Sequence, residues 1–434
     1  MLFFAVDGLE WDVLLPLVQR GEMPAFAGLM RAGVFGELAS LRPTSSPVIW
    51  TTIATGKRPE QHGIVDFVYA VEVDGALEPR VFNSGHRCTK AFWNILSDLG
   101  RTVDVVGWWI TYPAEPIEGL MVSQTNTTAA LVERAGGAIF KGTLQAGVAR
   151  QVWPEAREAE VLATLARVDA TLDARLAEHY GTPPHALGPL ERELWDESRW
   201  AFRADETYLE VVDARLDRPP ADVTAVYVGG PDVVGHRFWR YAYPEQFVSP
   251  PAAEQVENFG GLLDDAYRRV DRALAAMLAE LPPETTVFVV SDHGMVAHNT
   301  DAPFAPDAQR DDRLSGYHSD APPGVLLAAG PGIAARASDA PSLESLARGD
   351  LPRLGGVLDV LPTLLALLEL PLGEDMPGAP MVLVLDADWL AAHPTTSVAT
   401  HDDDAWREAH ARLRAESIDL DERLEQLRAL GYIR

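Results

Sequence analysis

Cysteine is almost absent from this chain, since Cys88 is the only one among 434 residues. A single cysteine excludes an internal disulfide framework and fits a reducing compartment. The sequence also lacks any run of about eighteen or more apolar residues, and its first residues carry no basic leader followed by a long apolar segment. We therefore expect a protein without a transmembrane segment that is located in the cytoplasm.

Positive charge is scarce as well. The formal net charge is -28, and the only lysines are Lys57, Lys90 and Lys141. Because attraction to the phosphate backbone relies on basic surface, this charge argues against a nucleic-acid scaffold as a partner. Hydrophobic residues, in contrast, make up 47% of the chain, which is enough for a large core. We expect either one large α/β domain or a core with an inserted lobe.

Two apolar runs lead directly into acidic and histidine residues. The run 285–290 precedes Ser291-Asp292-His293-Gly294, and the run 2–6 precedes Asp7-Gly8. Such runs are typical of buried parallel strands, and ligands bind at the carboxyl ends of strands in open α/β sheets. An Asp and a His there are costly to desolvate unless something such as a divalent ion holds them. A helix cap or a surface turn is the alternative for either motif alone.

Asp232 and His236 follow another expected strand, at 223–229. If the segment is helical, the Asp-x-x-x-His spacing places both side chains on one face, where they can reach a single ion. An ion pair or a cap is the alternative. Later a loop at 316–320 presents His318. The mixed nitrogen and oxygen donors suit zinc or manganese. The candidate ligands are Asp7, Asp232, His236, Asp292, His293 and His318, together with a hydroxyl near Ser46.

The hydroxyl cluster Thr44-Ser45-Ser46 stands where a loop enters an expected helix that ends at Thr55-Gly56. A hydroxyl in that position offers a nucleophile close to free backbone N–H groups, which favour anionic substrate oxygens. Helix capping is the ordinary role of each hydroxyl taken singly.

The remaining pattern predicts an α/β fold with a largely parallel central sheet flanked by helices on both faces. Between 126 and 206 the pattern changes to helix-like pieces with Gly- and Pro-containing connections, which we interpret as an inserted helical cap. The core then comprises 1–125 and 207–386, and 387–434 forms a helical tail. The further helices are expected at 11–19, 25–32, 155–177, 190–204, 262–281 and 359–370, and the further strands at 103–109, 119–123, 324–329 and 381–385.

The chain contains a set of short motifs, which are Asp7-Gly8, Ser46-Pro47 running to Thr55-Gly56, His62-Gly63-Ile64, Asp232-x-x-x-His236, Ser291-Asp292-His293-Gly294, Gly316-x-His318 and Asp359-x-x-Pro362-Thr363. In these motifs it resembles the alkaline phosphatase superfamily, and within it the type I phosphodiesterase and nucleotide pyrophosphatase branch. The resemblance implies an alkaline-phosphatase-like core. It also implies that Asp232, His236 and His318 hold one metal ion, and that Asp7, Asp292, His293 and the nucleophile hold the other.

The resemblance places the nucleophile at Ser46 when the family spacing is counted back from Thr55-Gly56. Counting from Pro47 favours Ser45 instead, and Thr44 is a weaker alternative. Nucleotide-cleaving members carry an Asn shortly after the His-Gly-Ile motif, whereas this chain continues Val65-Asp66-Phe67, which argues against a nucleotide substrate. Sulfatases have an Arg two residues after the Pro, and this chain lacks it.

The function implied is a two-metal-dependent hydrolase of phosphate esters, foremost a phosphodiesterase that forms a covalent phosphoseryl intermediate on Ser46. A phosphomonoesterase and a phosphomutase of the same superfamily are the alternatives. We expect two divalent ions per chain, zinc before manganese. The substrate is expected to be a small-molecule or lipid-headgroup phosphate ester.

Overall fold

Strands β1 (Leu2–Val6) and β9 (Val287–Val290) lie side by side and parallel, with Leu2 opposite Val287 and Ala5 opposite Val290. In this computed structural model every residue of both strands is buried, as their uninterrupted apolar sequences predict. Their carboxyl ends therefore reach the same edge of the sheet, and Asp7 and Asp292 follow there.

The structure describes residues 1–73, 75–125, 143–180, 189–216, 218–301, 314–338 and 340–414. The chain divides into two units. The described residues of unit 1 lie within Met1–Thr44, Thr164–Pro220 and Val226–Leu354. Those of unit 2 lie within Ser45–Ala163, Ala221–Ala225 and Gly355–Arg434.

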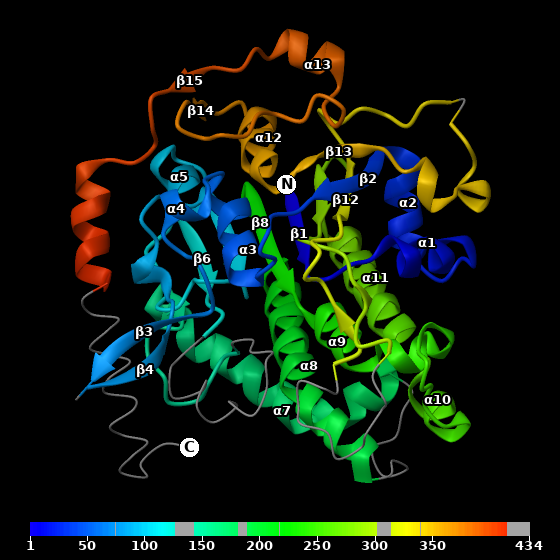
Figure 1. The fold of residues 1–434 in the computed structure, drawn as a ribbon. Helices are drawn as coiled ribbons and strands as arrows, with labels where there is room; N and C mark the ends of the chain where they lie inside the picture. Colours follow the sequence, from blue (N-terminus) through cyan, green and yellow to red (C-terminus); the bar gives the residue numbers. More distant parts are fainter. Residues whose placement is uncertain are drawn as a thin grey trace. The chain divides into compact units, whose positions relative to one another are not determined.

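The main sheet has nine strands among the described residues, in the order β13-β2-β12-β9-β1-β8-β5-β6-β7 (Figure 1). Strand β12 runs antiparallel to β2 and β9, and β7 runs antiparallel to β6, while β5 and β6 are parallel. The sheet is thus mixed and mostly parallel, and helices flank it, which confirms the predicted fold class. The other strands of this sheet are β2 (Val34–Ala39), β5 (Val103–Val106), β6 (Gly119–Val122), β7 (Val152–Trp153), β8 (Val223–Val228), β12 (Gly324–Ala329) and β13 (Arg353–Gly356).

Unit 1 holds the long helices. Helix α11 is amphipathic and packs its apolar face against α2, α8 and α9 (Figure 1). The helices of this unit are α1 (Trp11–Gln19), α2 (Pro24–Ala32), most of α7 (Glu158–Tyr180), α8 (Pro189–Leu216), α9 (Gly230–Ala242), η4 (Pro244–Gln246), α10 (Ala253–Phe259), α11 (Leu262–Glu280), η6 (Leu343–Ser345) and η7 (Arg348–Asp350), and β10 (Val296–Ala297) pairs with β11 (Gly316–Tyr317).

Unit 2 combines shorter helices with small strand pairs. Helix α3 (Ser46–Thr55) is buried along its whole length and contacts α12 (Val360–Leu367). The other elements are α4 (Pro59–His62), the hairpin of β3 (Val68–Val73) and β4 (Ala76–Val81), η1 (Ser84–His86), α5 (Phe92–Asp98), η2 (Glu155–Arg157), η8 (Val357–Asp359), β14 (Leu372–Gly373), α13 (Ala387–Ala392), β15 (Ser397–Val398) and a helix at 404–414.

The strand predicted at 381–385 is wrong. These residues form a turn in which the N–H groups of Val384 and Leu385 donate to the carbonyl of Met381. Val382 and Leu383 are 73% and 57% exposed, whereas Met381, Val384 and Leu385 are buried in the core. The turn satisfies these backbone groups locally, and Leu385 alone of the five residues forms a β-bridge.

Helices form where the inserted cap was predicted, although α8 continues to Leu216, beyond the expected end of the segment. Residues 126–142 and 181–188 of that segment, and 415–434 of the predicted tail, lie outside the described residues. The boundaries of core, cap and tail stay a prediction. None of the helices in the described part of the chain combines the length and apolarity needed to cross a bilayer.

Candidate metal centre

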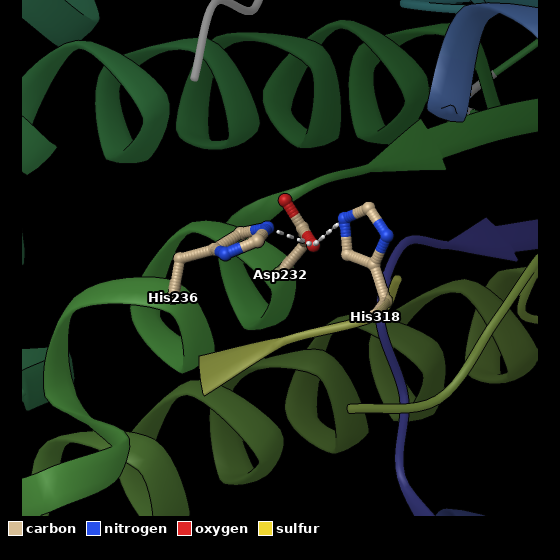
Figure 2. A group of neighbouring side chains, drawn as sticks. All are labelled: Asp232, His236 and His318. Carbon is tan, nitrogen blue, oxygen red and sulfur yellow. Dashed lines mark ion pairs between the residues drawn. The ribbon is translucent and has the colours of Figure 1, made fainter. Parts of the chain in front are cut away.

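Helix α9 carries Asp232 and His236 one turn apart, as the spacing predicted. His236 Nε2 lies 3.3 Å from Asp232 Oδ1. His318, directly after β11, places its Nε2 4.0 Å from the same oxygen. Figure 2 shows both imidazole rings turned toward the Asp232 carboxylate. We call Asp232, His236 and His318 the α9 trio.

Asp7, Asp292 and His293 form a second group, which we call the β1–β9 trio. His293 Nε2 lies 3.3 Å from Asp7 Oδ1 and 3.4 Å from Asp292 Oδ2. All three residues are buried because they follow two adjacent core strands, β1 and β9. Six of the predicted site residues therefore lie in unit 1 as two groups of three.

The two trios are neighbours. The rings of His318 and His293 stack with centroids 3.9 Å apart, and His318 also lies 4.9 Å from the ring of His236. The turn after β1 reaches α9 as well, because a Cβ on Gly8 would lie 2.8 Å from the Cα of Asp232. A centre with two sets of donors thus forms at the carboxyl ends of β1, β8 and β9.

Backbone carbonyls hold two of the imidazole rings. His236 Nδ1 lies 2.8 Å from the Gly316 carbonyl oxygen, and His293 Nδ1 lies 3.0 Å from that of Gly294. A proton on Nδ1 that bonds a carbonyl leaves the Nε2 lone pair available to a metal ion. In both residues Nε2 is the atom that faces the carboxylates.

The electrostatics of the β1–β9 trio favour added positive charge. Burial raises the pKa of Asp292 well above its usual value, and the charge of Asp7 raises it further. Burial alone would lower the pKa of His293, but Asp292 and then Asp7 raise it to about 10. Burial likewise opposes the charge on Asp7, yet the contacts with His293 and Tyr227 hold its pKa below the usual range. A cation placed among these groups would relieve the repulsion between the carboxylates.

The donor atoms fit divalent metal ions. Within the described residues, Asp232 Oδ1, both carboxylate oxygens of Asp292 and His293 Nε2 are buried without a hydrogen-bond partner. Buried polar atoms are almost always bonded, so such a cluster requires an explanation. The ligand atoms of each trio all lie within 4.8 Å of one another. Carboxylate and imidazole donors at this spacing match the ligands that zinc and manganese bind.

Ser46, the predicted nucleophile, belongs to unit 2. It is the first residue of α3 and only 5% exposed, and Ser45 is the N-cap residue. The Thr44 hydroxyl donates to the carbonyl of Leu41 at 3.3 Å. The expected position at a helix start is therefore confirmed, while the choice among the three hydroxyls stays a prediction.

Sequence reasoning missed the residues that support the trios. Tyr227 on β8 donates its hydroxyl to Asp7 Oδ2 at 2.5 Å. Asp205 on α8 accepts the N–H groups of Gly229 and Gly230 at the start of α9. A tyrosine inside a buried strand that ends at the site was the one available signal for Tyr227. No signal in the sequence indicated Asp205, because nothing in its local sequence distinguishes it from other helical carboxylates.

The fold and the two trios together define an alkaline-phosphatase-like hydrolase. The fold matches that of a four-substitution variant of the alkaline phosphatase PafA, with a TM-score of 0.51 at 14% identity over 89% of this chain and 99% of that one. The model of the type I phosphodiesterase / nucleotide pyrophosphatase family matches residues 1–340, and the chain belongs to this family. It is a phosphoester hydrolase of a metal-dependent family, and it has candidate metal-binding groups.

Two other solved structures show weaker likeness. Human ectonucleotide pyrophosphatase / phosphodiesterase 5 has 13% identity and a TM-score of 0.45, with 89% of this chain and 100% of that one covered. Phosphonoacetate hydrolase from Sinorhizobium meliloti has 17% identity and a TM-score of 0.39, with 68% of this chain covered, and this chain spans only 56% of that one. Comparison with curated proteins gives no match.

Proposed function

We propose that this protein is a phosphodiesterase that uses two divalent metal ions, one held by each trio. The observation that carries this proposal is the pair of adjacent buried trios, in which Asp232 Oδ1, both oxygens of Asp292 and His293 Nε2 have no hydrogen-bond partner among the described residues. Zinc is the first candidate because three of the six donors are imidazoles, and manganese is the second.

Residues of the chain carry out different parts of the proposed reaction. Ser46 Oγ attacks phosphorus, the ester oxygen leaves, and the phosphoseryl group is later hydrolysed by water, so two inversions give net retention. The positive end of the α3 dipole, at its N-terminus, favours negative charge on the phosphoryl oxygens. The bound ions would supply neutralisation of these oxygens and a lower pKa for the attacking hydroxyl.

The proposed substrate is a small-molecule or lipid-headgroup phosphodiester. Val65-Asp66-Phe67 stands where nucleotide-cleaving members of the family have an Asn, which is why we do not propose a nucleotide. A phosphomonoester is the alternative within the same chemistry. The expected cytoplasmic location stays a prediction.

Metal analysis combined with a substrate panel tests the proposal. Purified protein is expected to hold two ions per chain, and His236→Ala or His318→Ala to lower occupancy of one site, since each removes a ligand of the same ion. Aryl phosphodiesters should be cleaved faster than aryl phosphomonoesters. Absence of metal in protein prepared without chelator, combined with no activation by zinc or manganese, would refute the proposal.

The nucleophile is tested with matched hydroxyl variants. Ser46→Ala should keep most of the metal and lower turnover by on the order of a hundredfold or more, because only the covalent route is removed. Ser45→Ala and Thr44→Ala serve as controls with near-normal turnover. An inactive Ser45→Ala beside an active Ser46→Ala would move the role to Ser45, and three active variants would exclude a covalent step from this loop.

A further inference from the structure

Tyr227 lies near the carboxyl end of β8 and hydrogen-bonds Asp7. Its hydroxyl is 2.5 Å from Asp7 Oδ2, and both residues are 1% exposed. The backbone of Asp7 is held by the next residue of β8, because the Asp7 N–H donates to the carbonyl of Val228 at 2.9 Å. The main chain and the side chain of Asp7 are therefore both held by the end of β8.

The hydrogen bond gives the two oxygens of Asp7 different partners. An ionised carboxylate can only accept, so the Tyr227 hydroxyl is the donor to Oδ2. Oδ1 is the oxygen that faces the imidazole of His293, at 3.3 Å. Asp292 differs, since within the described residues neither of its oxygens has a hydrogen bond.

We propose that Tyr227 is a positioning residue for the metal ion of the β1–β9 trio: its hydroxyl holds Asp7 Oδ2 and leaves Oδ1 as the one ligand oxygen of this carboxylate. The proposal rests on the proposed function, which makes this trio a metal site. Without the hydroxyl, the carboxylate loses one of the groups that orient it and Oδ2 loses a buried donor. The ion then binds a carboxylate whose orientation is not fixed before the ion arrives.

Tyr227→Phe is the test, with zinc titrated into metal-free protein against a chelating dye. Loss of a hydrogen bond to a metal ligand typically weakens metal binding by about 10- to 100-fold. We expect that loss at one of the two sites and wild-type affinity at the other. Tyr208→Phe is the control, because Tyr208 is a fully buried tyrosine of α8 and should leave both affinities unchanged.

A double variant separates positioning from a merely structural role. In an Asp7→Ala background the Tyr227→Phe change should produce no further loss of zinc affinity, because the tyrosine acts through that carboxylate. Lower stability of metal-free Tyr227→Phe with unchanged zinc affinity would overturn the inference. Wild-type protein that binds no ion at this trio would instead refute the proposed function itself.

Fluorinated tyrosine at position 227 keeps the test decisive if Tyr227→Phe does not fold. The fluorinated ring retains the shape and the hydroxyl but donates a stronger hydrogen bond. A changed zinc affinity at one site with unchanged metal-free stability supports the inference, and unchanged affinity at both sites overturns it.

Discussion

Gly8 is a residue of the centre that tolerates little change. Its φ of +69° is in the left-handed region, and a Cβ there would lie 2.8 Å from both Cα and Cβ of Asp232. Two independent reasons therefore require glycine: the backbone conformation and the close approach of β1 to α9. Any side chain must push Asp7 and Asp232 apart, and these two residues belong to different trios.

Gly8→Ala should lower zinc affinity at both trios and reduce turnover by on the order of a hundredfold, because small displacements of a catalytic group have effects of that size. Gly21→Ala is the matched control. Gly21 also has a positive φ, of +74°, but a Cβ there meets nothing within 4 Å. The control should lose only about 1–2 kcal/mol of stability from backbone strain and keep its zinc affinity. Equal zinc affinities in the two variants would contradict the role of close approach.

At this scale the sequence predicted the donors but not what holds them. Asp7, Asp292 and His293 stand next to apolar strands, so residue type and position were enough to single them out. Tyr227 was missed because its partner Asp7 is 220 positions away, and only the pairing of β1 with β8 brings the two together.

Helix α9 positions two residues of the α9 trio, and its N-terminus has no side-chain cap of its own. Gly229 occupies the N-cap position and makes no side-chain cap hydrogen bond. Asp205 of α8 replaces the cap, accepting the N–H groups of Gly229 at 3.1 Å and Gly230 at 2.6 Å. Its negative charge also lies at the positive end of the α9 dipole. Helix α8 therefore supports the helix that carries Asp232 and His236.

Asp205→Ala should lower the free energy of unfolding by about 1–2 kcal/mol, the usual effect of losing a helix cap. Zinc affinity should fall at the α9 trio more than at the β1–β9 trio, because only the former depends on the start of α9. Asp196→Ala, at an exposed position of the same helix, is the control. Urea unfolding of metal-free protein and zinc titration provide the two measurements. Equal losses at both trios would argue for general destabilisation instead.

Helices and strands with a clear apolar pattern were predictable from the sequence. Strands that depend on pairing with a distant strand were not. Strands β1 and β12 and helix α1 agree with the predicted bounds, because each has a clear apolar pattern. The mixed sequence of β2 was not recognised, since it is a strand through its antiparallel pairing with β12. The turn at 381–385 is the reverse case, an apolar run that forms a turn and a single β-bridge at Leu385 instead of a strand.

For the whole molecule, composition predicted an acidic protein with a large core, while its division into two units was not predictable from the sequence. Within unit 1, three helices are joined by ion pairs of one buried carboxylate. Glu206 of α8 accepts from Arg269 of α11 at 2.6 Å and lies 3.5 Å from Arg175 of α7. The Glu206 side chain is only 2% exposed, so this contact is shielded from solvent.

Glu206 should make the stability of unit 1 depend on pH in the acid range. Burial opposes its charge, but His179 and Arg269 lower its pKa from the usual 4.5 to about 2. A folded-state pKa below the unfolded one gives stability that is fully present above pH 4.5 and is lost as pH falls toward about 2. A shift of this size corresponds to on the order of 3 kcal/mol of unfolding free energy.

The difference in unfolding free energy between wild type and Glu206→Gln, both metal-free, should therefore shrink as pH falls from 4.5 toward about 2. The metal ligands titrate alike in both proteins, so they cancel in the difference. Glu284→Gln, at an exposed position, should show no such pH dependence. A pH-independent difference for Glu206→Gln would show that this carboxylate is not held ionised by its neighbours.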